Sequence, residues 1–150
     1  MSGIVVGADG SDSSRHALRW AMQEAVLRHV PLTVMAVHPD PVRPATMIYW
    51  ALPTYPANSH NLDLLQKAVQ EFVDKAASEI GGTVPELTVS LVTGNPAEEL
   101  VKASRDADMI VVGSRGSGGF GRLLLGSVSS QVSRHAACAV VLISGTRQAS

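Results

Sequence analysis

Short apolar runs without alternation recur along the chain, and each one ends at a polar or turn-forming residue. Runs of about four to eight such residues are typical of strands that are buried on both faces of a parallel sheet. The sequence predicts strands at Ile4–Ala8, Leu32–Val37, Leu87–Val92, Met109–Val112 and Ala139–Ile143.

Between these runs the apolar residues recur at the helical period. Apolar pairs return every four residues after the segment SDSS, whose side chains are favoured helix N-caps. A second amphipathic stretch runs from Asn61 to Ile80 and ends at a pair of glycines. Asn95 followed by Pro96 predicts the start of a third helix, and Ser127 to about Ala136 a short fourth one.

Strands that alternate with helices predict the α/β class. We expect one domain over residues 1–150, a doubly wound, open five-stranded parallel sheet in the order 3-2-1-4-5, Rossmann-like, with helices on both faces. Ligands bind such sheets at the carboxyl ends of the strands, where the strand order reverses. Asp9, Val37 and the loop 113–127 follow strands, so they converge on one crevice if the first and fourth strands are neighbours.

The composition narrows the class of partner. Hydrophobic residues make up 45% of the chain and charged residues 17%, with a net charge of -1, which favours neither disorder nor nucleic-acid binding. The single cysteine, Cys138, excludes a disulfide framework and is expected to be a buried, inert thiol. The first residues do not resemble a signal peptide, and no apolar run reaches the roughly 18 residues of a membrane span. We therefore expect a soluble cytoplasmic protein with no membrane or nucleic-acid partner.

The segment VVGSRGSGGFGRLLLGS, residues 111–127, carries the candidate chemistry. Its GSGGFG matches the dinucleotide pattern G-x-G-x-x-G, but that pattern needs an acidic residue about 20 positions later, and no Asp or Glu follows Asp108. Gly121 to Ser127 imitates a P-loop without its lysine. The spacing that remains is Gly113, two residues, Gly116, nine residues, Gly126 and Ser127. Glycine lets a ligand approach the backbone, and a helix N-terminus favours phosphate.

These residues resemble the ATP-binding branch of the universal stress protein family. The resemblance covers nearly the whole chain and rests on IVVGADGSDSS, LTVMAVH and the segment from GNPAEEL to CAVVLI, which contains the spacing G-2x-G-9x-G-[ST]. It implies that the ligand is ATP, bound with or without Mg²⁺. It implies that Asp9 holds the ribose, that Val37 meets adenine through its backbone, and that the remaining contacts come from Gly7, Ala8, Val112, Gly113, Arg115, Gly116, Gly126, Ser127 and Val128.

Each of these residues also has an ordinary structural interpretation. Asp9 in an Asp-Gly-Ser sequence can simply cap a turn. Ser127 is at least a helix N-cap, and Val37 is mainly a core residue. The five histidines show no metal-ligand spacing, and methionines such as Met22, Met35, Met47 and Met109 are expected to fill the core or its rim. Residues 39–60, which include Tyr49, Trp50 and Tyr55, match no motif.

Three functions remain open. The first is a nucleotide-dependent stress-response regulator, which we prefer because the chain lacks a P-loop lysine, a catalytic-loop motif and an obvious base, so no residue is assigned a catalytic role. The second is an ATPase or adenylating enzyme of related fold, and slow hydrolysis fits the first function too. The third is an interaction module without nucleotide. The apolar last strand, CAVVLI, would be a bare edge, so we expect a homodimer that covers it.

Overall fold

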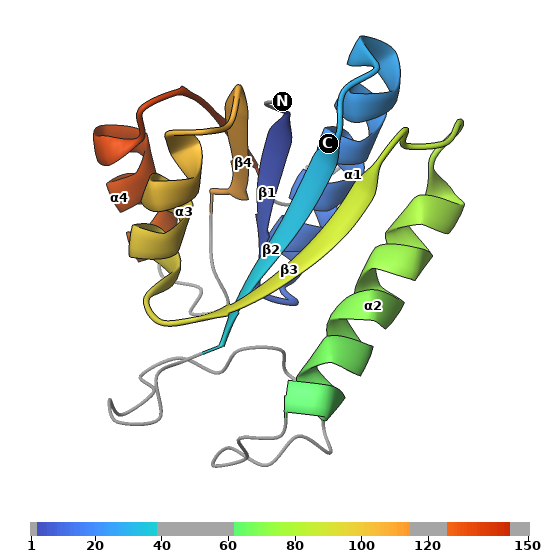
Figure 1. Cartoon of the computed structure of the whole chain (residues 1–150), viewed down its shortest axis with the longest axis horizontal. Helices are drawn as coiled ribbons and strands as arrows, with labels where there is room; N and C mark the ends of the chain where they lie inside the picture. The colour runs from blue at the N-terminus through green and yellow to red at the C-terminus, as the bar shows by residue number, and fades with distance from the viewer. Residues whose placement is uncertain (1–2, 39–61, 115–125, 145–150) are drawn as a thin grey trace, which may run out of the picture.

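The computed structural model describes residues 3–38, 62–114 and 126–144, in which strands and helices alternate (Figure 1). The elements are β1 (Ile4–Ala8), α1 (Asp12–Arg28), β2 (Leu32–His38), α2 (Leu62–Glu79), β3 (Leu87–Thr93), α3 (Pro96–Ser104), β4 (Met109–Gly113), α4 (Ser127–His135) and β5 (Ala139–Ile143). All predicted strands are present, and β2, β3 and β4 each run one residue further than expected. The segment 39–61 and most of the glycine loop, 115–125, lie outside the described residues.

The five strands form one parallel sheet in the order β3-β2-β1-β4-β5, which confirms the predicted doubly wound topology. The ladder between β2 and β3 holds seven residue pairs, from Leu32↔Leu87 to His38↔Thr93. The β1–β4 ladder holds three, from Ile4↔Met109 to Val6↔Val111. β3 and β5 are therefore the two edges of the sheet.

Helices cover both faces of the sheet and bury two separate cores. α1 and α2 pack on one face, where the buried cluster includes Ile4 and Val6 of β1 together with Leu18 of α1. α3 and α4 lie side by side on the other face (Figure 1), over a smaller cluster that includes Leu100 and Val132. Because successive strand residues point to opposite faces, β1, β2, β4 and β5 contribute to both clusters, whereas the edge strand β3 contributes to the first one only.

The structure corrects the expectation for Cys138. Its side chain is only partly buried, because it lies in the turn before the edge strand β5 rather than inside the sheet. Partial burial raises the pKa of the Cys138 thiol; a hydrogen bond with the Ile110 backbone opposes this rise, and the negative charge of Asp108 adds to it.

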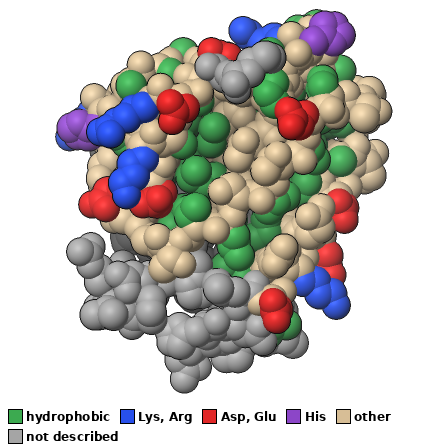
Figure 2. Space-filling model, viewed as in Figure 1, with side chains coloured by type: hydrophobic (Ala, Val, Ile, Leu, Met, Phe, Trp, Pro, Cys, Tyr) green, Lys and Arg blue, Asp and Glu red, His purple; other side chains and the backbone are tan. Residues whose placement is uncertain are grey.

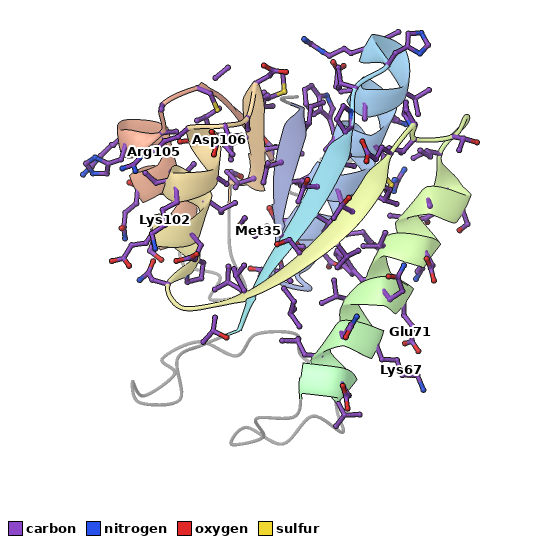
Figure 3. All side chains as sticks on the ribbon, viewed as in Figure 1. Met35, Lys67, Glu71, Lys102, Arg105 and Asp106 are labelled. Atoms are coloured by element: carbon purple, nitrogen blue, oxygen red, sulfur yellow. The ribbon has the colours of Figure 1, made fainter. Side chains whose placement is uncertain are left out.

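The methionines that can be placed lie where the sequence predicts them. Met22 is fully buried, Met109 is nearly so, and Met35 is packed at the rim of the second core, on the α3 side of the sheet (Figure 3). Met47 lies outside the described residues.

Charged side chains of both signs are interspersed on the face shown in Figure 2. The labelled Lys102 of α3 and Lys67 and Glu71 of α2 project outward from their helices, and Arg105 and Asp106 lie in the turn after α3 (Figure 3). The described part of this face therefore has no continuous basic patch.

Candidate functional site

The candidate site lies where the strand order reverses. The chain passes from β1 outward through β2 to β3 and then returns to β4 on the other side of β1, so β1 and β4 are neighbours. This is the arrangement that brings the β1–α1 turn and the end of β4 to one crevice at the carboxyl edge of the sheet. The predicted adjacency of the first and fourth strands is confirmed.

The turn from β1 into α1 is held by its own polar groups. Asp9 Oδ1 accepts a hydrogen bond from the Ser11 N–H at 2.9 Å, and Ser11 Oγ accepts one from the Ser14 N–H at 3.1 Å, which caps α1. The Ser14 hydroxyl donates to the Ser11 carbonyl at 3.0 Å, and Gly10 has φ of 83°, a conformation that suits glycine. The ordinary turn role of Asp9 is thus present, and its role towards ribose stays a prediction.

Two of the predicted site glycines face opposite layers of the molecule. A Cβ built on Gly7 would lie 3.0 Å from Leu100 Cδ1 and 3.4 Å from Val112 Cγ1, on the α3 side. A Cβ built on Gly113 would overlap the Ser13 hydroxyl and lie 2.9 Å from the Ser13 carbonyl carbon, on the α1 side. Both glycines therefore allow a helix to approach the sheet closely. The space of the missing side chain of Gly113 is occupied by α1, and the approach of a ligand to the Gly113 backbone stays a prediction.

The ends of the glycine loop are joined by hydrogen bonds. Ser114 N–H donates to the Ile143 carbonyl of β5, and the Gly126 N–H donates to the Ser114 carbonyl, both at 2.8 Å. The Ser129 hydroxyl lies 3.1 Å from the carbonyl oxygens of both Ser114 and Gly126. These bonds, which we call the loop neck, hold the start of α4 against the end of β4. Arg115 and Gly116 lie beyond the neck, outside the described residues.

The N-terminus of α4 differs from those of α1 and α3. Ser11 caps α1 and Asn95 caps α3 with a side-chain oxygen, whereas Gly126 occupies the N-cap of α4 and, in the described part of the chain, no side chain caps this helix. Free N–H groups at a helix N-terminus, with the helix dipole, favour an anion. Ser127 is the first helical residue and is exposed, so its predicted N-cap role is wrong; Gly126 takes that position because its backbone is extended, with φ of -61° and ψ of 159°.

Four other predicted site residues are mainly packing residues. Ala8 and Val37 lie in or at the ends of β1 and β2 and are 8% and 5% exposed; Val112 of β4 is 4% exposed, and Val128 packs against the second core. Ala8, Val37 and Val112 are buried, so mainly their backbones are available to a ligand at the edge of the sheet, whereas the side chain of Val128 is partly exposed. For Val37, the prediction of contact through the backbone is consistent with this burial and is not tested by it.

Sequence reasoning missed three serines that build the site. Ser13 packs against Gly113, Ser14 stabilises the β1–α1 turn, and Ser129 closes the loop neck; all three are buried. A buried serine leaves little sequence signal, although SDSS and SVSS place each of them in the first turn of a helix. Among the residues that the structure describes, no three His, Cys, Asp or Glu side chains gather as metal ligands would. No described helix has the length and apolarity to span a bilayer.

The fold is an open, doubly wound α/β sheet with helices on both faces, and its topological switch point, where ligands bind in such folds, lies between β1 and β4. The chain belongs to the universal stress protein family, whose family model matches residues 1–144. A universal stress protein of Mycobacterium tuberculosis is 38% identical over 146 residues, which covers 94% of this chain and 47% of that protein. The chain spans about half the length of the curated relatives that it matches.

Two similar solved structures contain an adenine nucleotide. A universal stress protein in complex with cAMP is 26% identical and has a TM-score of 0.64, over 97% of this chain and 98% of that one. The universal stress protein from Archaeoglobus fulgidus in complex with dAMP is 29% identical and has a TM-score of 0.61, over 95% of this chain and 98% of that one.

Proposed function

We propose that this chain is an ATP-binding universal stress protein that acts as a nucleotide-dependent regulator of a stress response. The observation that carries the proposal is the N-terminus of α4, which lacks a side-chain cap among the described residues and is fixed beside β4 by the loop neck. Such a terminus offers N–H donors and a partial positive charge to a phosphate without the cost of displacing a capping side chain. The cAMP and dAMP complexes of similar proteins support an adenine nucleotide.

In this proposal the two sides of the crevice bind different parts of the nucleotide. The β1–α1 turn, with Asp9, holds the ribose hydroxyls, and the Val37 backbone meets the adenine. Ser127 and Val128 direct their N–H groups to the phosphates, Gly126 leaves the start of α4 open to them, and Arg115 and Gly116 complete the loop. ATP binds with or without Mg²⁺, and the cytoplasm is the proposed location.

Regulation is favoured over efficient catalysis because phosphoryl transfer needs a positioned nucleophile, oxygen ligands for a metal and charge stabilisation. Around the described part of the crevice the turn uses Asp9 Oδ1 to bind its own backbone, and the nearby serines cap helices or bind backbone carbonyls. Slow ATP hydrolysis is compatible with the proposal. Turnover above roughly 1 per second, within the usual enzyme range, would instead support the ATPase or adenylating enzyme.

The proposal includes a homodimer formed through β5. This strand is an edge of the sheet, and its residues from Val140 to Ile143 are partly exposed although all are apolar. Pairing with a second copy would satisfy its free backbone groups and bury this surface. Sedimentation at micromolar concentration should give twice the chain mass, and a monomer there would refute this part.

The test of nucleotide binding is a calorimetric titration of nucleotide-free protein with ATP and Mg²⁺, repeated with ADP, AMP and cAMP. We expect saturation near one ATP per chain. In Gly126→Val the binding should be lost while the fold is kept, because the backbone of Gly126 suits valine and the added side chain stands at the helix N-terminus.

Gly81→Val is the matched control, since a Cβ at Gly81 meets nothing within 4 Å, and it should bind as the parent does. Unchanged affinity in Gly126→Val would remove α4 from the site. Absence of binding in the parent protein itself would leave the interaction module as the function.

A further inference from the structure

The contact between Ser13 and Gly113 joins the start of α1 to the end of β4. The proposed nucleotide site needs a fixed spacing between these two segments. Ser13 lies in the first turn of α1 and is 7% exposed; Gly113 is the last residue of β4. A Cβ on Gly113 would overlap the Ser13 hydroxyl oxygen and lie 3.0 Å from Ser13 Cβ and 2.9 Å from its carbonyl carbon. Real Cβ atoms essentially never approach other atoms to less than 3.0 Å. The helix therefore rests directly on the backbone of the strand.

Each partner in this contact continues into one side of the crevice. Ser13 is four residues after Asp9 and follows the hydrogen-bonded β1–α1 turn. Gly113 precedes Ser114, whose N–H and carbonyl anchor the loop neck. A side chain at position 113 would have to displace either α1 or the end of β4, and both shifts change the spacing between the turn and the neck. Close-packed elements transmit such a shift rather than absorb it.

We propose that Ser13 is a positioning residue for the nucleotide site and that the missing side chain of Gly113, the first glycine of the signature, serves this contact with α1. The role of Ser13 in nucleotide binding rests on the proposed function. The packing of Ser13 against Gly113, which is the packing half of the inference, can be tested in the protein without nucleotide. The small side chain at position 13 and the absent one at position 113 act as a pair, so changing one alters what the other tolerates.

The first arm of the experiment measures thermal unfolding without nucleotide for Gly113→Ala, Ser13→Gly and the double variant. Gly113→Ala should lower the Tm by roughly 3–10 °C, as overpacking does in a domain of this size. In the Ser13→Gly background the same substitution should cost less, because the hydroxyl that it would overlap and the Cβ at 3.0 Å are gone and only the backbone carbonyl carbon at 2.9 Å remains. Gly81→Ala, at a site with no neighbour within 4 Å, controls for the general effect of replacing glycine.

The second arm measures ATP affinity by calorimetry at a temperature at which all variants are folded. Gly113→Ala should weaken binding by about tenfold or more, because the site loses its preorganised spacing, and the Ser13→Gly background should restore part of that affinity. Restoration is the decisive readout, since a ligand that simply collides with residue 113 would not be helped by a change in α1.

The outcomes separate the two proposals. If Gly113→Ala leaves the Tm unchanged, or lowers it as much in the Ser13→Gly background as in the parent, the contact does not matter and the inference is wrong. If the Tm recovers in the double variant but the affinity does not, Gly113 meets the ligand directly and the positioning role is refuted. If the parent protein binds no nucleotide, the proposed function fails and takes the positioning role with it, while the Tm data still decide the packing half.

Discussion

Ser129 provides a direct test of the loop neck. Its hydroxyl is buried and lies 3.1 Å from the carbonyls of Ser114 and Gly126, so Ser129→Ala removes the only side chain in the described neck that binds both ends of the loop. Neither carbonyl is left without a partner, because Ser114 O still accepts the Gly126 N–H and Gly126 O still accepts the Ser130 N–H. The cost is therefore that of a lost hydrogen bond and not that of a buried unsatisfied acceptor.

The magnitude follows from these partners. A buried hydrogen bond contributes about 0.5–1.5 kcal/mol net, and alanine recovers a few tenths of that through its higher helix propensity. We expect Ser129→Ala to lower the free energy of unfolding by about 1 kcal/mol, and the Tm by about 2–4 °C for a chain of this length. ATP affinity should fall as well, because the start of α4 is held less firmly against β4.

Ser133→Ala is the matched control on the same helix. The Ser133 hydroxyl donates to the Ser130 carbonyl at 2.8 Å but is exposed, so its loss is compensated by water and the Tm should stay within about 1 °C of the parent. The assay is thermal and urea unfolding of both variants, followed by calorimetric titration with ATP. Equal Tm values for the two variants would show that Ser129 does not hold the neck.

Three further predictions concern the frame of the site. His29→Gly should raise the free energy of unfolding by about 0.5–1 kcal/mol in urea titration, because His29 ends α1 in the left-handed conformation, with φ of 57°, and a loss of stability would contradict this. Asn95→Ala should cost about 1 kcal/mol in the same assay, since Asn95 Oδ1 accepts the Glu98 N–H at the start of α3, and an unchanged midpoint would show that the cap is dispensable. Iodoacetamide should modify Cys138 more slowly in the native protein than in urea at equal pH, because partial burial raises the thiol pKa and lowers the thiolate fraction. The raised pKa of Cys138 stabilises the fold fully at pH values below the ordinary thiol pKa, and this stabilisation is lost as the pH rises through the raised pKa. Equal alkylation rates would argue against the raised pKa.

The fold was predictable because its signals are local and repeated. Unalternated apolar runs, the Ser11 and Asn95 caps and the Gly81–Gly82 stop each mark an element within the chain itself, and the structure places those elements within a residue or two of the predicted bounds. Exceptions occur where tertiary position decides. Cys138 is partly exposed because β5 is an edge, and Gly126 rather than Ser127 caps α4 because of its backbone conformation.

The site was predictable only in outline. The glycine spacing and the β1–β4 adjacency locate the crevice, but the reason for Gly113 depends on a contact with Ser13, which lies far earlier in the chain. Ser129 acts through carbonyl oxygens, which no sequence pattern distinguishes. A sequence motif records neither packing between distant segments nor hydrogen bonds to the backbone, so these parts of the site could not be predicted.

The pairing of β1 with β4 determines when the two sides of the crevice come together during synthesis. One of its sides is the β1–α1 turn, which is made before the other strands of this sheet, and the other is formed by Ser114 and the start of α4, which are made after four of the five strands. A partly synthesised chain can therefore pair β1, β2 and β3 without having the crevice at all. Binding of the proposed nucleotide to a nascent chain would thus report that α4 has been made, and a chain released before α4 would have four strands of the sheet without the helix N-terminus that is proposed to bind phosphate.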